Sequence, residues 1–408
     1  MCIRDSSTTA RHHPVGFALP SDAPSAARTI LQLLQRLQHG SLTLQLPDGS
    51  LQRFGNGQGV HATLHLHNWN ACGAALKSGD IGFAESYFAG DWSTGNLTDL
   101  LRLFLANRRD LEDVIYGTWL GRLAYWVRHK LNRNSRTNSR KNIHAHYDLG
   151  NAFYQLWLDP TMNYSSAWFQ TPEQDMVSAQ HAKVRRALQL AGVKPGDRVL
   201  EIGCGWGALA EKAVTEFGAS VTGVTLSTEQ LAYAQQRVPQ ADLRLQDYRD
   251  IQDGPYDAIC SIEMVEAVGR EYWPTYFQSV ARLLKPGGQA CIQSIVIQDE
   301  LFERYIRGTD FIQQYVFPGG CLPSPSTFRA EAERAGLEVV DQFAFGLDYA
   351  RTLREWRDRF MHEQDRLLQQ GFDQRFLRIW EFYLAYCEAA FAEGSTDVVQ
   401  FTLRRPAH

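Results

Sequence analysis

A glycine-rich loop after an apolar run constrains the fold of this chain more than any other segment. The run "VLEIGCGWG", residues 199–207, predicts a strand that ends at the loop and a helix that begins after it. Gly203, Gly205 and Gly207 let the backbone turn sharply and let a ligand approach it closely. From about residue 180 onward, predicted helices alternate with short apolar strands. This alternation predicts a parallel, doubly wound α/β sheet.

Further features of the same region narrow the class of ligand. The glycine spacing is G-x-G-x-G and not the G-x-G-x-x-G of dinucleotide-binding folds. Glu201 comes directly before the loop, and the turn "LLKPGG" follows at 283–288 between a predicted helix and a predicted strand. Together these features resemble the class I S-adenosylmethionine-dependent methyltransferases, with their Rossmann-like doubly wound sheet. The resemblance implies that S-adenosylmethionine contacts Glu201, Gly203, Cys204, Gly205 and Gly207.

The second strand of this region departs from the usual pattern of that class. It ends in "GVTLSTEQ", with Thr225 and Leu226 where an acid usually binds the ribose hydroxyls. We therefore expect the hydrogen bonds to come from Thr225 and Gln230 or from the backbone. Asp247, after the third strand, is placed to accept a hydrogen bond from the adenine amino group, and Tyr248 to stack there.

Six segments follow one another over roughly 142–405. They are "HYDLGNAFYQLWLDPTMNYSSAWF", "GVTLSTEQ", "IEMVEAVGREYW", "FIQQYVFPGGCLPS", "FGLDYARTLREW" and "YCEAAFAEGSTDVVQFTLRR". In this order they resemble the cyclopropane-fatty-acyl-phospholipid synthases and the related mycolic acid methyltransferases. Residues 25–120 also look like the N-terminal lipid-associated domain of the longer bacterial members. The resemblance implies methyl transfer to a cis double bond in an acyl chain of membrane phospholipid.

This chemistry makes demands on the side chains around the reacting carbon atoms. An alkene needs no deprotonation before it attacks the methyl group, but the attack leaves a carbocation on the chain. The site must therefore be dry, lined by ring faces and able to accept one proton late. We expect Tyr164 and Ser165 to face the cofactor and Trp168 the acyl chain. The candidate ring walls are Tyr164, Trp168, Trp206, Tyr315, Phe317 and Tyr349.

In the family, the proton acceptor is a bicarbonate ion in a small polar cage. The matching segments imply that Glu266 and Tyr349 supply cage side chains and that backbone amides near Ser166 and Ile295 complete it. Glu266 follows a predicted core strand, so we expect burial to raise its pKa. Cys387 lies where family members carry a cysteine once viewed as a nucleophile. Its apolar surroundings, "FYLAYCEAAF", favour a buried structural thiol instead.

Three positions depart from the family pattern near this cage. Ser166 replaces a usual cysteine, Gln293 replaces a usual histidine, and Ala267 replaces a histidine that commonly follows the glutamate. A glutamine side chain can donate a hydrogen bond but cannot shuttle a proton. We therefore expect methyl transfer to an unsaturated chain. The sequence leaves open whether bicarbonate is retained and whether the product is a cyclopropane or a methyl- or methylene-branched chain.

The N-terminal part of the chain predicts a smaller α+β domain. Residues 1–20 show no pattern and are excluded from the fold prediction. Residues 21–131 predict the lipid-associated domain and a basic helix, with a first helix at 25–37, a hairpin that turns at 47–49, a strand over 60–68 and helices near 70–78 and 97–107. Residues 132–142 predict a linker, and residues 143–408 the methyltransferase domain. The basic helix and linker favour two roles equally, docking on an anionic membrane and a solvated interdomain connection.

Composition excludes several other classes of protein. The net charge of −4 argues against a nucleic-acid partner. Seven cysteines without a C-x-x-C pair argue against a disulfide framework and a zinc site, and favour a reduced, cytosolic compartment. No apolar run predicts a transmembrane helix or a secretory signal. The basic segment and the phospholipid substrate that the resemblance implies lead us to expect peripheral association with the inner membrane face. Two alternatives stay open, a small-molecule N- or O-methyltransferase and a non-catalytic lipid-binding protein, as does a homodimer.

Overall fold

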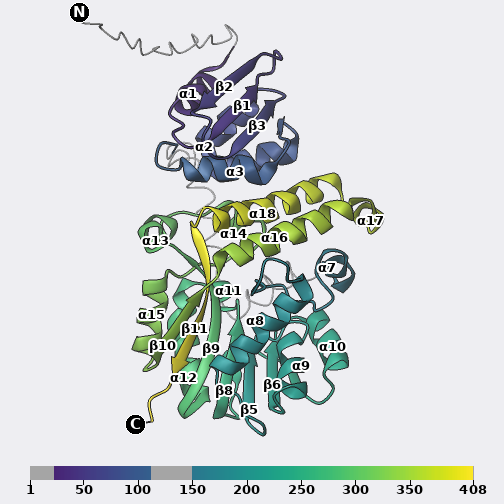
Figure 1. The fold of residues 1–408 in the computed structure, drawn as a ribbon, viewed down its shortest axis with the longest axis vertical. Coiled ribbons are helices and arrows are strands. Elements are labelled where there is room, and N and C mark those ends of the chain that lie inside the picture. The colour runs from purple at the N-terminus through teal and green to yellow at the C-terminus, as the bar shows by residue number, and fades with distance from the viewer. Residues whose placement is uncertain (1–22, 112–148, 408) are drawn as a thin grey trace, which may run out of the picture.

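The computed structural model describes residues 23–111 and 149–407 (Figure 1). The predicted linker at 132–142 and the basic helix before it lie outside the described residues. A small α+β unit precedes this gap, and a larger α/β unit follows it. The two units meet at a pair of long helices, α16 (Gly346–His362) and α18 (Gln374–Ala392), which lie between the small unit and the large sheet in Figure 1.

The small unit is a four-stranded sheet in the order β2-β1-β3-β4, packed with three helices. The predicted hairpin is confirmed, because β1 and β2 pair antiparallel on either side of the turn at 47–49. The predicted helix near 70–78 is longer in the structure and kinks at Gly79, whose φ is 62°. The elements are α1 (Ser25–Leu34), β1 (Ser41–Gln45), β2 (Leu51–Gly55), β3 (His61–Leu66), α2 (Asn70–Ala89), β4 (Trp92–Ser93) and α3 (Leu97–Ala106).

The large unit contains a seven-stranded sheet in the order β10-β11-β9-β8-β5-β6-β7. Neighbouring strands from β9 to β7 pair parallel, as predicted. The predicted doubly wound α/β sheet is confirmed, and at one edge it gains a strand that the pattern did not indicate, because β11 runs antiparallel to β9 and β10. The chain enters β11 from α18 beside the carboxyl end of β9, where Thr396 pairs with Ile297, and must run back from there. The strands are β5 (Arg198–Ile202), β6 (Ser220–Thr225), β7 (Asp242–Leu245), β8 (Tyr256–Ile262), β9 (Leu284–Ile297), β10 (Glu338–Ala344) and β11 (Thr396–Arg404).

The two faces of this sheet bury different sets of side chains. Val199 and Cys260 point into a core shared with α8, α9 and α10. Leu200 and Ile259, their neighbours along the strands, point into a core shared with α12 and α15. The Ser227 side chain caps α10, because it accepts a hydrogen bond from a backbone amide of the first turn. These helices are α8 (Met176–Leu190), α9 (Ala208–Thr215), α10 (Thr228–Arg237), α12 (Trp273–Leu283) and α15 (Pro325–Arg334).

Shorter elements complete the large unit and connect the sheet to the two long helices. They are α7 (Asn151–Trp157), α11 (Val265–Val268), α13 (Asp299–Tyr305), α14 (Phe311–Tyr315), α17 (Gln364–Gln369) and the 3₁₀ turns at Tyr248–Asp250 and Arg270–Tyr272. Within the described residues, no helix has the length and apolar character needed to cross a membrane.

The small unit is joined to α18 by hydrogen bonds and ion pairs as well as by apolar contacts. The Tyr87 hydroxyl donates to Glu381 at 2.7 Å, and the Thr98 hydroxyl donates to Glu388 at 2.9 Å. Arg102 forms an ion pair with Glu393 at 2.8 Å. Side chains of α18 and of the residue directly after it therefore connect the two units.

Candidate active site

A cavity lies at the carboxyl ends of β5, β6 and β8, where ligands bind in open α/β sheets. Its volume is about 1170 Å³ when counted out to its open mouth. All of the predicted cofactor residues except Gly207 line it, namely Tyr164, Ser165, Glu201, Gly203, Cys204, Gly205, Thr225, Leu226, Gln230, Asp247 and Tyr248. Gly207 lies next to them as the residue before α9.

The glycine loop supplies the floor of this cavity. Gly203 has a φ of 84°, and a Cβ atom built on it would lie 2.2 Å from Cγ of Met264. The backbone at this position therefore fits only a glycine without rearrangement. A Cβ atom built on Gly205 would meet no atom within 4 Å, so this part of the loop presents open backbone to the cavity. A ligand can approach the main chain closely there.

Glu201 brings an unpartnered polar atom to the cavity wall. Its side chain is buried, and its Oε2 atom has no hydrogen-bond partner in the described structure. Burial raises the pKa of this carboxyl group to about 8. A buried polar atom without a hydrogen-bond partner costs free energy. The Oε2 atom of Glu201 therefore fits a polar ligand that supplies the missing hydrogen bond. S-adenosylmethionine, with its amino-acid and ribose groups, meets this requirement.

The residues expected at the ribose and the adenine already contact one another. The Thr225 hydroxyl donates to the Gln230 side chain at 3.1 Å and accepts from the backbone amide of Ser227. The Asp247 carboxylate accepts hydrogen bonds from the backbone and the guanidinium group of Arg249. Arg249 was not predicted from the sequence and also lines the cavity. Because Arg249 pairs with Asp247, the charge of Arg249 is already compensated within the protein.

The carboxylate of Glu263 occupies the position that the resemblance assigned to bicarbonate. The Ser166 amide donates to Glu263 Oε1 at 2.9 Å, the Gln293 side-chain amide donates to the same atom at 2.8 Å, and the Tyr349 hydroxyl donates to Oε2 at 2.7 Å. These donors are three of those expected around the anion. Because Glu263 already takes them, a bicarbonate ion does not fit this arrangement. The prediction also missed Glu263, which lines the cofactor cavity.

Glu266 has a different environment from the one expected. Its Oε1 atom accepts a hydrogen bond from the Ile295 amide, so that amide also serves a protein carboxyl group and not a free anion. Burial raises the pKa of Glu266 to about 8, in the expected direction. Tyr349, the other predicted cage side chain, contacts Glu263. Glu266 therefore ties α11 to β9, and Glu263 is the carboxyl group that the donors surround.

The backbone of Glu263 adopts a strained, left-handed conformation. Among the described residues other than glycine, only Met162 and Glu263 have a positive φ, 55° and 52°. Both line the cofactor cavity. A left-handed conformation costs such residues roughly 1–2 kcal/mol and is found preferentially at functional sites. Burial raises the pKa of Glu263, while the positive charge of Lys183 and the three donors lower it.

The predicted ring walls separate into two groups in the structure. Tyr164 and Tyr349 pack around Trp356, and the Tyr164 hydroxyl lies 2.7 Å from the Tyr383 hydroxyl. Phe317 packs against Tyr383, and Trp206 lines the cofactor cavity. Two other candidate ring walls lie apart from this group. Trp168 packs against Phe343 and Arg186, and Tyr315 packs against Phe88 in the small unit and donates to Glu85.

Cys387 lies on α18 close to this aromatic group. Its side chain is partly buried, and the loss of solvent raises the pKa of its thiol well above the ordinary value. A nucleophilic cysteine needs a lowered pKa, so this environment is that of a structural thiol. Among the described residues, no cluster of three or more histidine, cysteine, aspartate or glutamate side chains could hold a metal ion.

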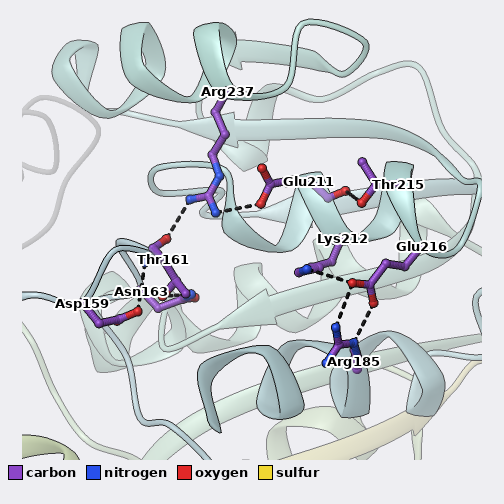
Figure 2. Close-up of polar contacts among 9 residues, drawn as sticks. All are labelled: Asp159, Thr161, Asn163, Arg185, Glu211, Lys212, Thr215, Glu216 and Arg237. Carbon is purple, nitrogen blue, oxygen red and sulfur yellow. Dashed lines mark hydrogen bonds and ion pairs between the residues drawn. The ribbon is translucent and has the colours of Figure 1, made fainter. Parts of the chain in front are cut away.

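Arg237 of α10 fixes the segment that carries Tyr164 and Ser165. Its guanidinium group donates to the Thr161 carbonyl at 2.7 Å and to Glu211 of α9 at 2.8 Å (Figure 2). Figure 2 also shows Asp159 and Asn163 bound to Thr161, at 2.9 Å each. The loop that forms one wall of the cavity is therefore held against α9 and α10.

We expect Arg237→Met to weaken the binding of S-adenosylhomocysteine about 3- to 10-fold. The change keeps the apolar stem but removes a charged hydrogen bond to the loop, a loss of roughly 1 kcal/mol at a partly exposed position. Titration calorimetry measures the effect. Arg185→Met is the matched control, because Arg185 pairs with Glu216 on the outer side of α9 and does not touch the loop (Figure 2). Equal losses in the two variants would contradict a specific role of Arg237.

The fold and this cavity define an S-adenosylmethionine-dependent methyltransferase. The family model described as mycolic acid cyclopropane synthetase matches residues 134–401, and the chain belongs to this family. Over 401 residues, 95% of this chain and 93% of the relative, it is 40% identical to the tuberculostearic acid methyltransferase UfaA1 of Mycobacterium tuberculosis. It is 34% identical to the cyclopropane-fatty-acyl-phospholipid synthase of Escherichia coli K12, over 84% of this chain and 88% of that one.

A solved structure supports the same assignment. The mycolic acid cyclopropane synthase CmaA1, complexed with SAH and CTAB, matches with a TM-score of 0.61 and 31% identity. The match covers 65% of this chain and 98% of that chain. Relatives of this family act on lipids, and S-adenosylmethionine is the methyl donor.

Proposed function

We propose that this enzyme transfers the methyl group of S-adenosylmethionine to a cis double bond in an acyl chain of membrane phospholipid and leaves a branched, unsaturated chain. The observation that carries the proposal is the Glu263 carboxylate, which three donors hold beside the cofactor cavity. A carboxylate fixed at this place serves as the proton acceptor that the reaction requires.

The reaction can be written so that its atoms balance. The alkene π electrons form a bond to the methyl carbon as the bond from that carbon to sulfur breaks, and S-adenosylhomocysteine leaves. A positive charge then resides on the second alkene carbon. Loss of one proton from the chain to Glu263 removes this charge. If a 1,2-hydride shift first moves the cation to the methylated carbon, loss of a methyl proton gives a methylene branch.

The aromatic side chains that pack beside Glu263 support this proposed reaction. Tyr164, Tyr349 and Trp356 pack together, and Phe391 lies 4.4 Å from Tyr349 between ring centroids. Ring faces stabilise a nearby cation by roughly 0.5–2 kcal/mol each and exclude water that would otherwise capture it. The similarity to the tuberculostearic acid methyltransferase over 95% of the chain supports a branched product.

A second cavity supports a lipid ligand for the protein as a whole. It lies between the small unit and α18, and its volume is about 1000 Å³ when counted out to its mouth. Among the described residues that line it, Asp80 alone is charged, and burial raises the pKa of Asp80 to about 7. The remaining wall is almost entirely hydrocarbon, as hydrophobic ligand sites usually are. Representative lining residues are Ile30, Leu34, Leu64, Leu66, Phe83, Leu101, Phe104 and Phe382.

Lipid analysis tests the proposed product directly. Phospholipids from cells that express the protein are converted to methyl esters and analysed by mass spectrometry before and after catalytic hydrogenation under mild conditions. We expect new chains that are heavier by one CH₂ and that still take up hydrogen. A cyclopropane also adds one CH₂ but has lost the double bond. That second outcome, which the similarity to the E. coli synthase favours, would reject the branched product and keep methyl transfer.

We further propose that the protein acts at the cytoplasmic face of the membrane as a peripheral enzyme. The support is the sequence between the two units, where Arg133, Arg136 and Arg140 occur without acidic neighbours. Anionic lipids attract such residues by about 1 kcal/mol each. Replacing all three with glutamine should weaken sedimentation with anionic vesicles by about tenfold or more, with the largest effect at low salt. Unchanged sedimentation would reject docking through this segment.

A further inference from the structure

A buried lysine behind the cofactor cavity makes its direct hydrogen bonds to neutral groups, while the carboxyl groups of Glu263, Asp159 and Glu201 act on it from farther away. Lys183 of α8 has no exposed surface, and its ammonium group lies 2.5 Å from the Ser165 hydroxyl oxygen and 3.5 Å from the Asn163 side-chain oxygen. In the part of the chain that the structure describes, no carboxylate forms an ion pair with it. A buried charge is costly unless an opposite charge compensates it.

The hydrogen bonds of Ser165 determine where its own proton can go. An ammonium group can only donate hydrogen bonds, so the Ser165 hydroxyl oxygen accepts one from Lys183. The Ser165 carbonyl accepts from Gln180 at 2.9 Å, so α8 holds this residue at both its backbone and its side chain. Ser165 also lines the cofactor cavity. The hydroxyl hydrogen is thus directed away from Lys183 and available to an acceptor in the cavity.

Two other cations near the cavity, in the part of the chain that the structure describes, form direct ion pairs. Arg249 pairs with Asp247, and Arg237 pairs with Glu211. S-adenosylmethionine carries one anionic group, the α-carboxylate of its methionine part. Its adenosine part has no phosphate, so no other part of the molecule can compensate a buried cation. Lys183 instead donates directly to Ser165, a neutral residue that lines the cavity, and this arrangement fits the carboxylate.

We propose that Lys183 is a positioning residue that recognises the α-carboxylate of S-adenosylmethionine through the Ser165 hydroxyl. Lys183 polarises the hydroxyl and supplies the opposite charge, while Ser165 makes the direct hydrogen bond. The recognition concerns cofactor binding alone and is independent of the lipid product. It applies equally to S-adenosylhomocysteine, which keeps the same carboxylate.

The experiment compares two ligands that differ in this carboxylate. S-adenosylhomocysteine contains the amino-acid part, and 5′-methylthioadenosine lacks it. In the full-length protein, Lys183→Met should weaken the binding of S-adenosylhomocysteine by about 10- to 100-fold, which is the effect of one charge-assisted hydrogen bond. The binding of 5′-methylthioadenosine should change by less than about twofold. Both dissociation constants are measured by titration calorimetry.

A second variant and a pH series make the result decisive. Ser165→Ala should show the same selectivity for ligands with a carboxylate, and the double variant should lose little more than either single variant because the two residues act as a unit. Burial lowers the pKa of Lys183 to about 8, although the nearby carboxyl groups of Glu263, Asp159 and Glu201 act to raise it. The affinity of the unchanged protein for S-adenosylhomocysteine should therefore fall as the pH rises above 8. Lys183→Met keeps these carboxyl groups, including Glu201, whose pKa is also about 8, and should lack the part of the fall that comes from Lys183. Equal losses for the two ligands, or no loss for either, would overturn the proposal.

Discussion

Glu263→Gln is expected to lower kcat by about 10²- to 10⁴-fold, the usual contribution of a positioned proton acceptor. The amide has nearly the same shape as the carboxylate. It can still accept hydrogen bonds from the Ser166 amide and from Gln293 at one oxygen, so the local fold should persist. The affinity for S-adenosylhomocysteine should change by less than about threefold. Steady-state turnover of unsaturated phospholipid vesicles, with calorimetry for the ligand, measures both.

The pH dependence of turnover provides a separate test of the same residue. Burial raises the pKa of Glu263, and only the ionised form accepts a proton. The kcat of the unchanged enzyme should therefore fall as the pH decreases through this raised pKa. The residual activity of Glu263→Gln should lack this transition, since the amide does not titrate. A variant that kept both the rate and the transition would exclude Glu263 as the acceptor.

Glu263→Gly offers a matched control that can regain activity. The change relieves the positive φ at this position and leaves three donors without an acceptor. A small carboxylate or bicarbonate supplied in solution can then bind the Ser166 amide, Gln293 and the Tyr349 hydroxyl. We expect added bicarbonate or formate to restore part of the activity of Glu263→Gly and none of that of Glu263→Gln, whose side chain still fills the space. Equal responses of the two variants would contradict this arrangement.

Gly203→Ala is expected to lower the stability of the protein and to remove most of its cofactor binding. The added Cβ atom would lie 2.2 Å from Cγ of Met264, and the φ of 84° is unfavourable for alanine. Overpacking costs about 1–3 kcal/mol, and the left-handed backbone roughly 1–2 kcal/mol more. Displacement of the loop should weaken the binding of S-adenosylhomocysteine by at least about tenfold, equivalent to 1.4 kcal/mol.

Gly196→Ala separates the two causes of this loss. Gly196 has a similar φ of 87°, but a Cβ atom built on it meets nothing within 4 Å. It lies in the exposed turn before β5 and outside the cavity lining. The apparent melting temperature should fall less for Gly196→Ala than for Gly203→Ala, and the binding of S-adenosylhomocysteine should stay unchanged. Equal changes in melting temperature and binding for the two variants would show that the collision with Met264 does not cause the loss.

Local patterns predicted most of the fold because they depend on neighbouring residues. The cap at Ser227 and the strand before Gly203 follow from a few adjacent side chains, and both are found in the structure. The direction of β11 does not follow from such patterns. Its sequence fits a strand of either direction, and the antiparallel pairing with β9 depends on where α18 delivers the chain.

The candidate site shows the same division between local and long-range information. The residues of the glycine loop were predictable from spacing, and they line the cavity. Glu263 was not, because the donors that surround it lie 97, 30 and 86 residues away in sequence, at Ser166, Gln293 and Tyr349. An available signal was the position of Glu263 directly after a core strand that ends beside the glycine loop. The resemblance implied the cage role for Glu266, three residues later.

The contacts of α18 determine how the chain unfolds. Phe382 and Tyr386 belong to the large unit but line a cavity whose other walls come from the small unit. Glu381 accepts a hydrogen bond from Tyr87, and Glu393 forms an ion pair with Arg102, so carboxyl groups of the large unit have partners in the small unit. Separation of the units would expose apolar rings and leave carboxyl groups unpaired. The two units should therefore melt in a single cooperative transition, although a family model that begins at residue 134 describes only the second of them.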